Sequence, residues 1–249
     1  MIRETCNKCG NEVTEDRKLD NNVWNCINCG LEEYQSVDSS INEVNKEDLP
    51  KYYLNKEQTV FIILSEDTAT IKGDGKIYKK LWNFFKEELK LEDFRIEIKE
   101  KIQLPDDCSD LFYNFNKEIN IYSSIDTSNI IDMSEMFYMA KSANPDTKNW
   151  DTSNVKYMGR MFCNAKSANP DVSNWDVSNV TDMAAMFHKT NLANPNTSNW
   201  DVSNVTNIKW MFAGAKLANP DTSSWDVSNV TSMEAMFAWT TVASSNTSR

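Results

Sequence analysis

The chain has 249 residues, of which 40% are hydrophobic and 11% are aromatic, and its formal net charge is −11. This composition excludes a disordered chain, and no apolar run approaches the roughly 20 residues that a membrane-spanning helix needs. The formal charge is −5 in residues 1–58 and −3 in each of residues 59–125 and 126–249. Because phosphate backbones and anionic membranes are bound by clustered lysine and arginine, we expect neither nucleic acid nor a membrane as a partner.

Residues 1–33 contain four cysteines with the spacing of a zinc site. They form two Cys-x2-Cys pairs separated by sixteen residues, and each pair is followed by glycine. Two thiolates from each tight turn can complete a tetrahedral shell, so the spacing predicts a zinc ribbon that holds one structural Zn²⁺. A unit this small would take its folding free energy from the metal. The predicted ligands are Cys6, Cys9, Cys26 and Cys29.

The middle of the chain combines a linker with a small capping unit. Residues 34–58 are polar and acidic, and no period holds there, so we interpret them as an acidic linker. Residues 59–94 are expected to form an N-terminal cap made of a hairpin and a helix. Short apolar runs predict strands at 59–64 and 68–72, and apolar residues at helical spacing predict an amphipathic helix over about 76–90.

The second half of the chain is a repeat with a period of 25 residues. Five copies share a Trp-Asp-Val-Ser-Asn-Val type of motif and a Met-Phe pair, and a degenerate copy precedes them. An Ala-Asn-Pro turn follows four of the five Met-Phe pairs. A fixed period over five copies predicts a solenoid, which we place at residues 95–249. The motif tryptophans are Trp150, Trp175, Trp200 and Trp225, and Ile125 takes this place in the first regular copy.

Each coil is expected to contain one short strand and one short helix. Trp175 and Val177 alternate with polar residues, which predicts a strand, and Val180, Met183 and Phe187 have helical spacing. The predicted fold is therefore α/β, a leucine-rich-repeat-like solenoid of short parallel strands and short helices behind the small zinc ribbon. Recurring asparagines are interpreted as an internal ladder that satisfies backbone groups: Asn129, Asn154, Asn179, Asn204 and Asn229.

The pattern Trp-Asp-Val-Ser-Asn-Val-Thr-x-Met-x-x-Met-Phe resembles the bacterial surface protein repeat of the BspA-like, leucine-rich-repeat-related family. The resemblance covers about residues 95–240. It implies a leucine-rich-like solenoid used for binding, often as a secreted or wall-anchored adhesin, and it implies no catalytic residue.

Two sets of outward-facing residues are candidate binding surfaces. One aspartate recurs in every coil, and its carboxylate either hydrogen-bonds neighbouring turns or belongs to an acidic strip for a basic protein or cations. This column comprises Asp126, Asp151, Asp176, Asp201 and Asp226. The second candidate surface lies where the coils differ from one another, because a partner site needs non-repeated chemistry. It includes Tyr157, Arg160, Lys209 and Trp210.

These features favour a non-enzymatic protein-binding repeat protein in which the zinc ribbon is a structural or docking module. We find no nucleophile–base pair, phosphate loop or open metal site, and the single histidine, His188, occupies a variable repeat position. The alternatives are a BspA-like cell-surface adhesin and a nucleic-acid-associated regulator that acts through the ribbon. The sequence shows no secretory signal, and four metal-binding thiolates with two lone thiols are typical of a reducing compartment. We therefore expect the protein in the cytoplasm, with the cell surface as the alternative. The last coil lacks a polar cap, so end-to-end self-association through it is a further expectation.

Overall fold

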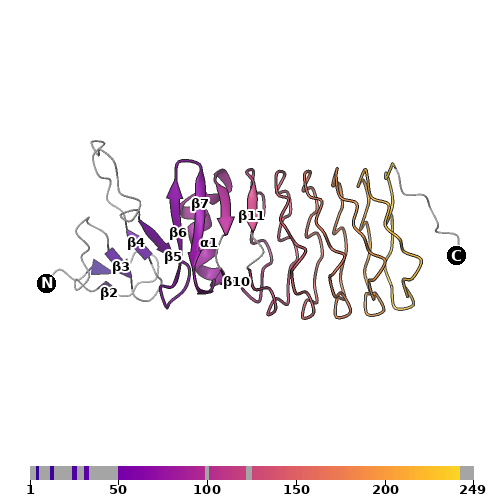
Figure 1. Ribbon diagram of the computed structural model, residues 1–249, viewed down its shortest axis with the longest axis horizontal. Coiled ribbons are helices and arrows are strands. Elements are labelled where there is room, and N and C mark those ends of the chain that lie inside the picture. The colour runs from indigo at the N-terminus through magenta and orange to yellow at the C-terminus, as the bar shows by residue number, and fades with distance from the viewer. Residues whose placement is uncertain are drawn as a thin grey trace.

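The computed structural model describes residues 50–98, 101–121 and 125–241, together with the backbone of four short strands near the N-terminus (Figure 1). These are β1 (Glu4–Thr5), β2 (Glu12–Val13), β3 (Trp24–Cys26) and β4 (Leu31–Glu33). β1 pairs with β2 and β3 pairs with β4, both antiparallel. Of the predicted zinc ligands, Cys6, Cys9 and Cys29 lie outside the described residues, and only the backbone of Cys26 is described, at the end of β3.

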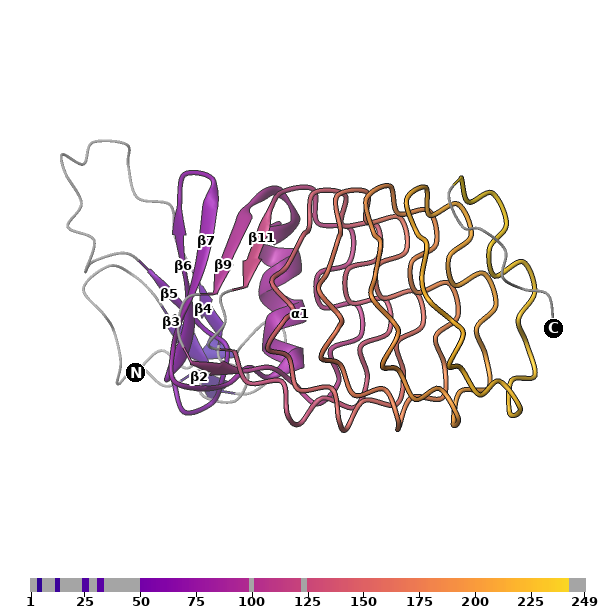
Figure 2. The same ribbon diagram turned by 45° about the vertical axis from the view of Figure 1, so that its right-hand side comes forward.

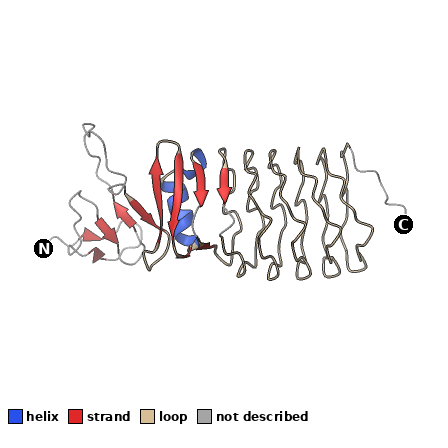
Figure 3. Ribbon diagram, viewed as in Figure 1, coloured by secondary structure: helices blue, strands red, loops and turns tan. Residues whose placement is uncertain are grey.

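A mixed five-stranded sheet forms the next part of the molecule, in the order β11-β9-β7-β6-β5 (Figure 3). Its first three strands in sequence form an antiparallel meander, whereas β7, β9 and β11 pair parallel. A separate parallel pair joins β8 to β10. The bounds are β5 (Lys51–Tyr53), β6 (Val60–Ser65), β7 (Thr68–Gly73), β8 (Gly75–Lys76), β9 (Arg95–Ile98), β10 (Ile102–Gln103) and β11 (Ile119–Ile121).

The helix α1 (Lys79–Glu88) packs on one face of this sheet beside the first repeat, and the 3₁₀ turn η2 (Leu91–Asp93) follows it (Figures 1 and 2). The apolar stripe of α1 buries Trp82 and Phe85. Two ion pairs at its N-terminal side, Lys76–Asp106 and Lys79–Asp107, join this region to the first repeat. No helix in the described part of the chain is long and apolar enough to cross a membrane.

The repeats form a stack of coils that lie side by side (Figures 1 and 2). Backbone hydrogen bonds join residues about one repeat apart, such as the N–H of Phe162 to the carbonyl of Met186 at 2.9 Å. Parallel bridges connect equivalent residues of successive coils, namely Asp107, Asp132, Tyr157, Asp182, Asn207 and Ser232. We call residues 101–241 the repeat stack, with 122–124 outside the described residues.

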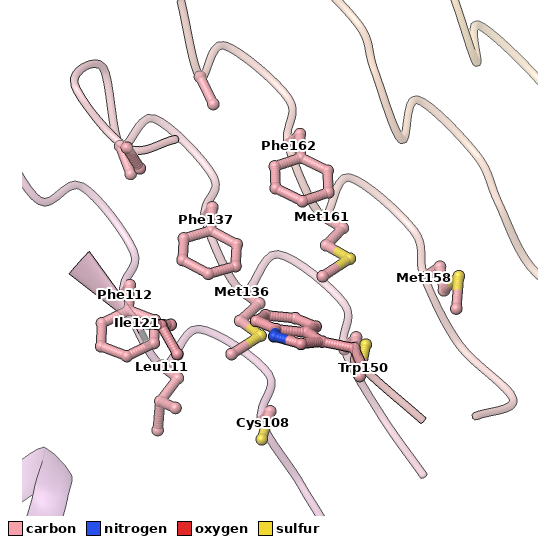
Figure 4. Close-up of a cluster of buried hydrophobic side chains, with 14 of the residues drawn as sticks. Cys108, Leu111, Phe112, Ile121, Met136, Phe137, Trp150, Met158, Met161 and Phe162 are labelled. Carbon is pink, nitrogen blue, oxygen red and sulfur yellow. The ribbon is translucent and has the colours of Figure 1, made fainter. Parts of the chain in front are cut away.

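Stacked aromatic rings form the centre of the repeat stack (Figure 4). One phenylalanine of every coil lies over the next, with ring centroids 5.3 to 5.7 Å apart and planes within 14° of parallel. This column comprises Phe112, Phe137, Phe162, Phe187, Phe212 and Phe237. Methionines from neighbouring columns fill the space beside it, as Met136 and Met161 do, and both are fully buried. The apolar residues that recur with the repeat therefore make one continuous core.

The predicted α/β solenoid of leucine-rich-repeat type is wrong. Regular secondary structure in the described residues comes from one mixed sheet, one α-helix and short strand pairs, and the last strand ends at Ile121. From residue 125 to 241 the coils contain only turns, irregular segments and isolated bridges. Neither the strand expected around Trp175 nor the helix expected from Val180 to Phe187 is present. The zinc-ribbon part of the prediction rests on cysteine side chains that lie outside the described residues.

Backbone conformation explains why helical spacing does not produce a helix. In each of the five coils with a Met-Phe pair, the residue just before the pair has a positive φ of 53° to 58°, as at Arg160, Ala185 and Trp210. A left-handed residue ends an α-helix, so only single turns form. Alternate N–H groups instead donate to the next coil: that of Ala185 bonds the carbonyl of Lys209 at 2.8 Å, while that of Met186 bonds Met183 within its own coil. Buried residues three apart therefore arise from successive turns.

Candidate binding surfaces

The recurring aspartates shape the turns in which they lie. In each of the five, Oδ1 accepts the backbone N–H of the serine two residues later at 3.0 Å. Hydrogen bonds from the Ser128 hydroxyl and backbone hold the pKa of Asp126 below its ordinary value. Asp126 is half-buried, while the other four remain exposed: Asp151, Asp176, Asp201 and Asp226. The column thus has a structural task and is also an exposed line of negative charge.

The recurring asparagines do satisfy backbone groups, but they do so at the surface and not inside the stack. The side-chain amide of Asn179 donates to the carbonyl of Ser153 in the preceding coil at 2.7 Å, and Asn154, Asn204 and Asn229 repeat this contact. All four side chains belong to exposed residues. Their role is to hold adjacent coils together, which explains the recurrence of the residue type.

The candidate residues at variable positions lie close together on one side of the stack. Tyr157 shares a bridge column with Asp182 and Asn207, and Arg160 occupies the same coil position as Trp210 two coils later. Tyr157 is 44% exposed and Trp210 is 41% exposed. The intervening coil offers the small residues Ala184 and Ala185 at this place. We call Tyr157, Arg160, Lys209 and Trp210 the variable patch.

Intramolecular contacts orient the side chains of the variable patch. Arg160 forms an ion pair with Glu135 of the preceding coil at 2.9 Å, and Lys209 pairs with Glu234 of the next coil at 2.6 Å. The ammonium group of Lys209 also lies 4.7 Å from the ring centroid of Trp210, whose other neighbour is the His188 ring at 6.1 Å. These contacts restrict the side chains before any partner binds, which lowers the entropic cost of recognition.

A lysine-bearing edge of the stack is a candidate surface that sequence reasoning missed. It consists of residues 136–145, 161–170, 186–195, 211–220 and 236–241, and these segments contain no aspartate or glutamate. Their basic residues are Lys141, Lys166, Lys189 and Lys216. Aligning the repeats by their 25-residue period would have shown these segments to be basic. The net charge of residues 126–249 hides this, because acidic residues elsewhere in the same coils outnumber the lysines. We call this surface the lysine edge.

A family model described as "Mycoplasma protein of unknown function, DUF285" matches residues 106–216 and 168–249, which together exceed half of the chain. The chain belongs to this family. The DUF285 match covers the repeat stack and begins after α1 and most of the sheet. Comparisons with curated proteins and with solved structures found no significant match.

The thiols and the histidine of this DUF285 member have surroundings that suit packing. Burial raises the pKa of the Cys108 thiol far above its ordinary value, and its S–H donates to the carbonyl of Pro105 at 3.2 Å. Burial likewise raises the pKa of Cys163 to about 11. Burial and then the nearby Lys189 lower the pKa of His188. Within the residues that the structure describes, no cluster of histidine, cysteine, aspartate or glutamate could hold a metal ion.

Proposed function

We propose that this chain is a non-enzymatic protein-binding repeat protein that recognises a protein partner through the variable patch. The carrying observation is the contrast between side chains that recur from coil to coil and side chains that do not. The asparagine side chains make the same inter-coil hydrogen bond in successive coils, so the stack itself explains their recurrence. Tyr157 and Trp210 depart from the repeat and remain partly exposed.

The chemistry of the variable patch supports protein recognition. Tryptophan, tyrosine and arginine are the residues that most often dominate interface energies, because they bury large areas and also make directed polar contacts. Arg160 forms an ion pair with Glu135, and Lys209 forms one with Glu234, so the two positive charges are neutralised at the surface. A partner would therefore gain most from the exposed parts of the Tyr157 and Trp210 rings, with the ion pairs forming a polar rim.

The N-terminal cysteines are assigned to one structural Zn²⁺. The two antiparallel strand pairs support this assignment, because in the sequence the first Cys-x2-Cys pair lies between β1 and β2, and the second begins at the last residue of β3 and ends before β4. A closed shell of four thiolates supplies folding energy and no reaction site. The resemblance of the repeat to BspA-like surface proteins supports a binding role, with a cell-surface adhesin as its more specific form.

Site-specific photo-crosslinking tests the variable patch. A photoreactive side chain is placed at position 157 or 210, and the matched control is placed at the exposed Asn149 on another part of the coil. We expect a protein of the native host to crosslink from 157 and 210 and not from 149. Tyr157→Ala and Trp210→Ala should then each weaken binding of that protein about 10-fold or more. Equal crosslinking from all three positions, or unchanged affinity in the double variant, would exclude the patch.

A further inference from the structure

The lysine edge carries one lysine on each of four successive coils, in a chain that is acidic as a whole. Every aspartate and glutamate between residues 126 and 241 lies outside the segments that form this edge. Among the described residues, none of its four lysines forms an ion pair with a carboxylate. Stacking thus separates positive charge from negative charge within each coil, which no regional charge sum can show.

The lysines are close enough to repel one another. The Nζ of Lys166 donates to the backbone carbonyl of Lys189 at 2.8 Å. Burial lowers the pKa of Lys166, and the neighbouring charges of Lys189, Lys216 and Lys141 lower it further. Within the described part of the stack, Lys166 thus has three lysine neighbours and no carboxylate partner, and an external negative charge would relieve the repulsion, so this edge attracts anions.

Large apolar side chains are exposed on the same edge. Leu192 is 48% exposed and Leu217 is 46% exposed, and the two occupy the same position in successive coils. Trp239 is 76% exposed and shares its coil position with Lys189 and Gly214. At Gly214 an added Cβ would lie 3.2 Å from Cγ of Lys189, so the missing side chain leaves room for the lysine stem between the two coils.

We propose that the lysine edge docks on the surface of an anionic lipid bilayer, with its lysines at the headgroups and Leu192, Leu217 and Trp239 entering the interface. Lysine stems can lie along apolar material while their ammonium groups reach phosphates. Tryptophan and leucine beside lysine are the composition of surfaces that lie in the membrane interface. The acidic remainder of the stack is repelled by the same membrane, so only this edge can face it.

Other polyanions fit the edge less well. Nucleic-acid binding would use the four charges but would leave the two leucines in water, and the edge has no arginine for bidentate phosphate contacts. An acidic protein segment could use both kinds of residue. It therefore enters the test as the outcome that would replace a membrane.

Vesicle co-sedimentation of the full chain tests the proposal. We expect binding to vesicles of phosphatidylglycerol mixed with phosphatidylcholine, little binding to phosphatidylcholine alone, and loss of binding at high salt. The double variant Lys189→Glu/Lys216→Glu should lower the partition coefficient by at least about 25-fold, at about fivefold for each lysine removed from an anionic surface. The matched control Lys148→Glu/Lys156→Glu changes net charge equally at exposed positions away from the edge and should bind far more strongly than the edge variant.

The apolar contribution needs its own pair of variants. Leu192→Ser/Trp239→Ser should weaken vesicle binding at constant charge, whereas Ile131→Ser, at a 44% exposed position off the edge, should not. Absence of binding to anionic vesicles overturns the proposal, as does equal loss in the edge and control charge variants. If poly-glutamate competes fully and the Leu192/Trp239 variant binds vesicles as well as the parent, the edge is a site for an acidic protein and the membrane assignment fails.

Discussion

The indole Nε1 of Trp82 in α1 donates a hydrogen bond of 2.7 Å to the backbone carbonyl of Leu111 in the first coil of the repeat stack. The Trp82 ring is fully buried and meets the Phe112 ring edge-on, with centroids 5.4 Å apart. Phe112 is the first member of the phenylalanine column that runs to Phe237. Trp82 therefore covers the N-terminal end of the phenylalanine column, with its ring against Phe112 and its indole N–H bonded to the backbone of the first coil.

Replacement of Trp82 should strongly destabilise the protein. Trp82→Ala leaves a cavity between α1 and the first coil, and we expect it to lower the free energy of unfolding by about 3–5 kcal/mol. Trp82→Phe keeps much of the packing and leaves the Leu111 carbonyl without its donor, at a cost of about 1–3 kcal/mol. Urea unfolding followed by circular dichroism measures both. The control is Trp225→Ala at the far, less buried end, and a loss there as large as that of Trp82→Ala would contradict the capping role.

Two glycines of the stack should respond in opposite ways to alanine. Gly214 has a φ of +68°, and an added Cβ would lie 3.2 Å from Cγ of Lys189, so Gly214→Ala should cost about 1–2 kcal/mol. At Gly159 the backbone is not left-handed, and the nearest atom to an added Cβ is 3.5 Å away. Gly159→Ala should therefore stabilise by about 0.4–1 kcal/mol, because it restricts the unfolded chain. Thermal unfolding of both variants checks the sign, and a stabilised Gly214→Ala would disprove the left-handed backbone there.

Stability should fall in acid through the aspartate turns. The side chain and backbone N–H of Ser203 hold the pKa of Asp201 below its ordinary value, so the folded carboxyl is the stronger acid. Stabilisation is then present at neutral pH and is lost as the pH falls below about 4 and passes through the folded pKa. Urea unfolding over a series of pH values between about 5 and 2 should show this loss.

An asparagine already present in the chain supplies the control for the acid prediction. Asn196 accepts the backbone N–H of Ser198 through Oδ1 at 3.2 Å, in the same two-residue turn that aspartates form elsewhere. Asp126→Asn, Asp201→Asn and Asp226→Asn together should keep the turns and reduce the pH dependence, because these three carboxyls have a lowered pKa in the folded protein. An unchanged pH dependence in this triple variant would assign the acid sensitivity to other carboxyls.

The N-terminal cysteines should bind one zinc ion per chain. Metal analysis of the purified protein should find one equivalent, and a strong chelator should expose thiols to a thiol reagent. Cys26→Ser should lose the metal. Cys163→Ala should retain it, since alanine already stands at this coil position in Ala213. Full zinc content in Cys26→Ser would rule out the four-cysteine site.

Local sequence signals predicted the hairpin and the helix before the stack. The strands expected at 59–64 and 68–72 agree with β6 (Val60–Ser65) and β7 (Thr68–Gly73), and the helix expected over 76–90 contains α1. Alternation and amphipathic spacing are properties of neighbouring residues, so the sequence displays them directly. The parallel pairing of β9 with β7, and of β11 with β9, is not local. The helix α1 separates β7 from β9 in the sequence, and most of the first coil separates β9 from β11.

The sequence by itself determined the 25-residue period and the residues that lie inside the stack, because burial follows residue type. Only the tertiary structure decided that the buried spacing comes from turns and not from helices. The positive φ occurs at Arg160, Ala185 and Trp210, which are three unlike residues, so no residue type predicts it. Hydrogen bonds to the next coil impose this backbone conformation. The lysine edge has the same origin, since its charges lie far apart along the chain and meet only when the coils stack.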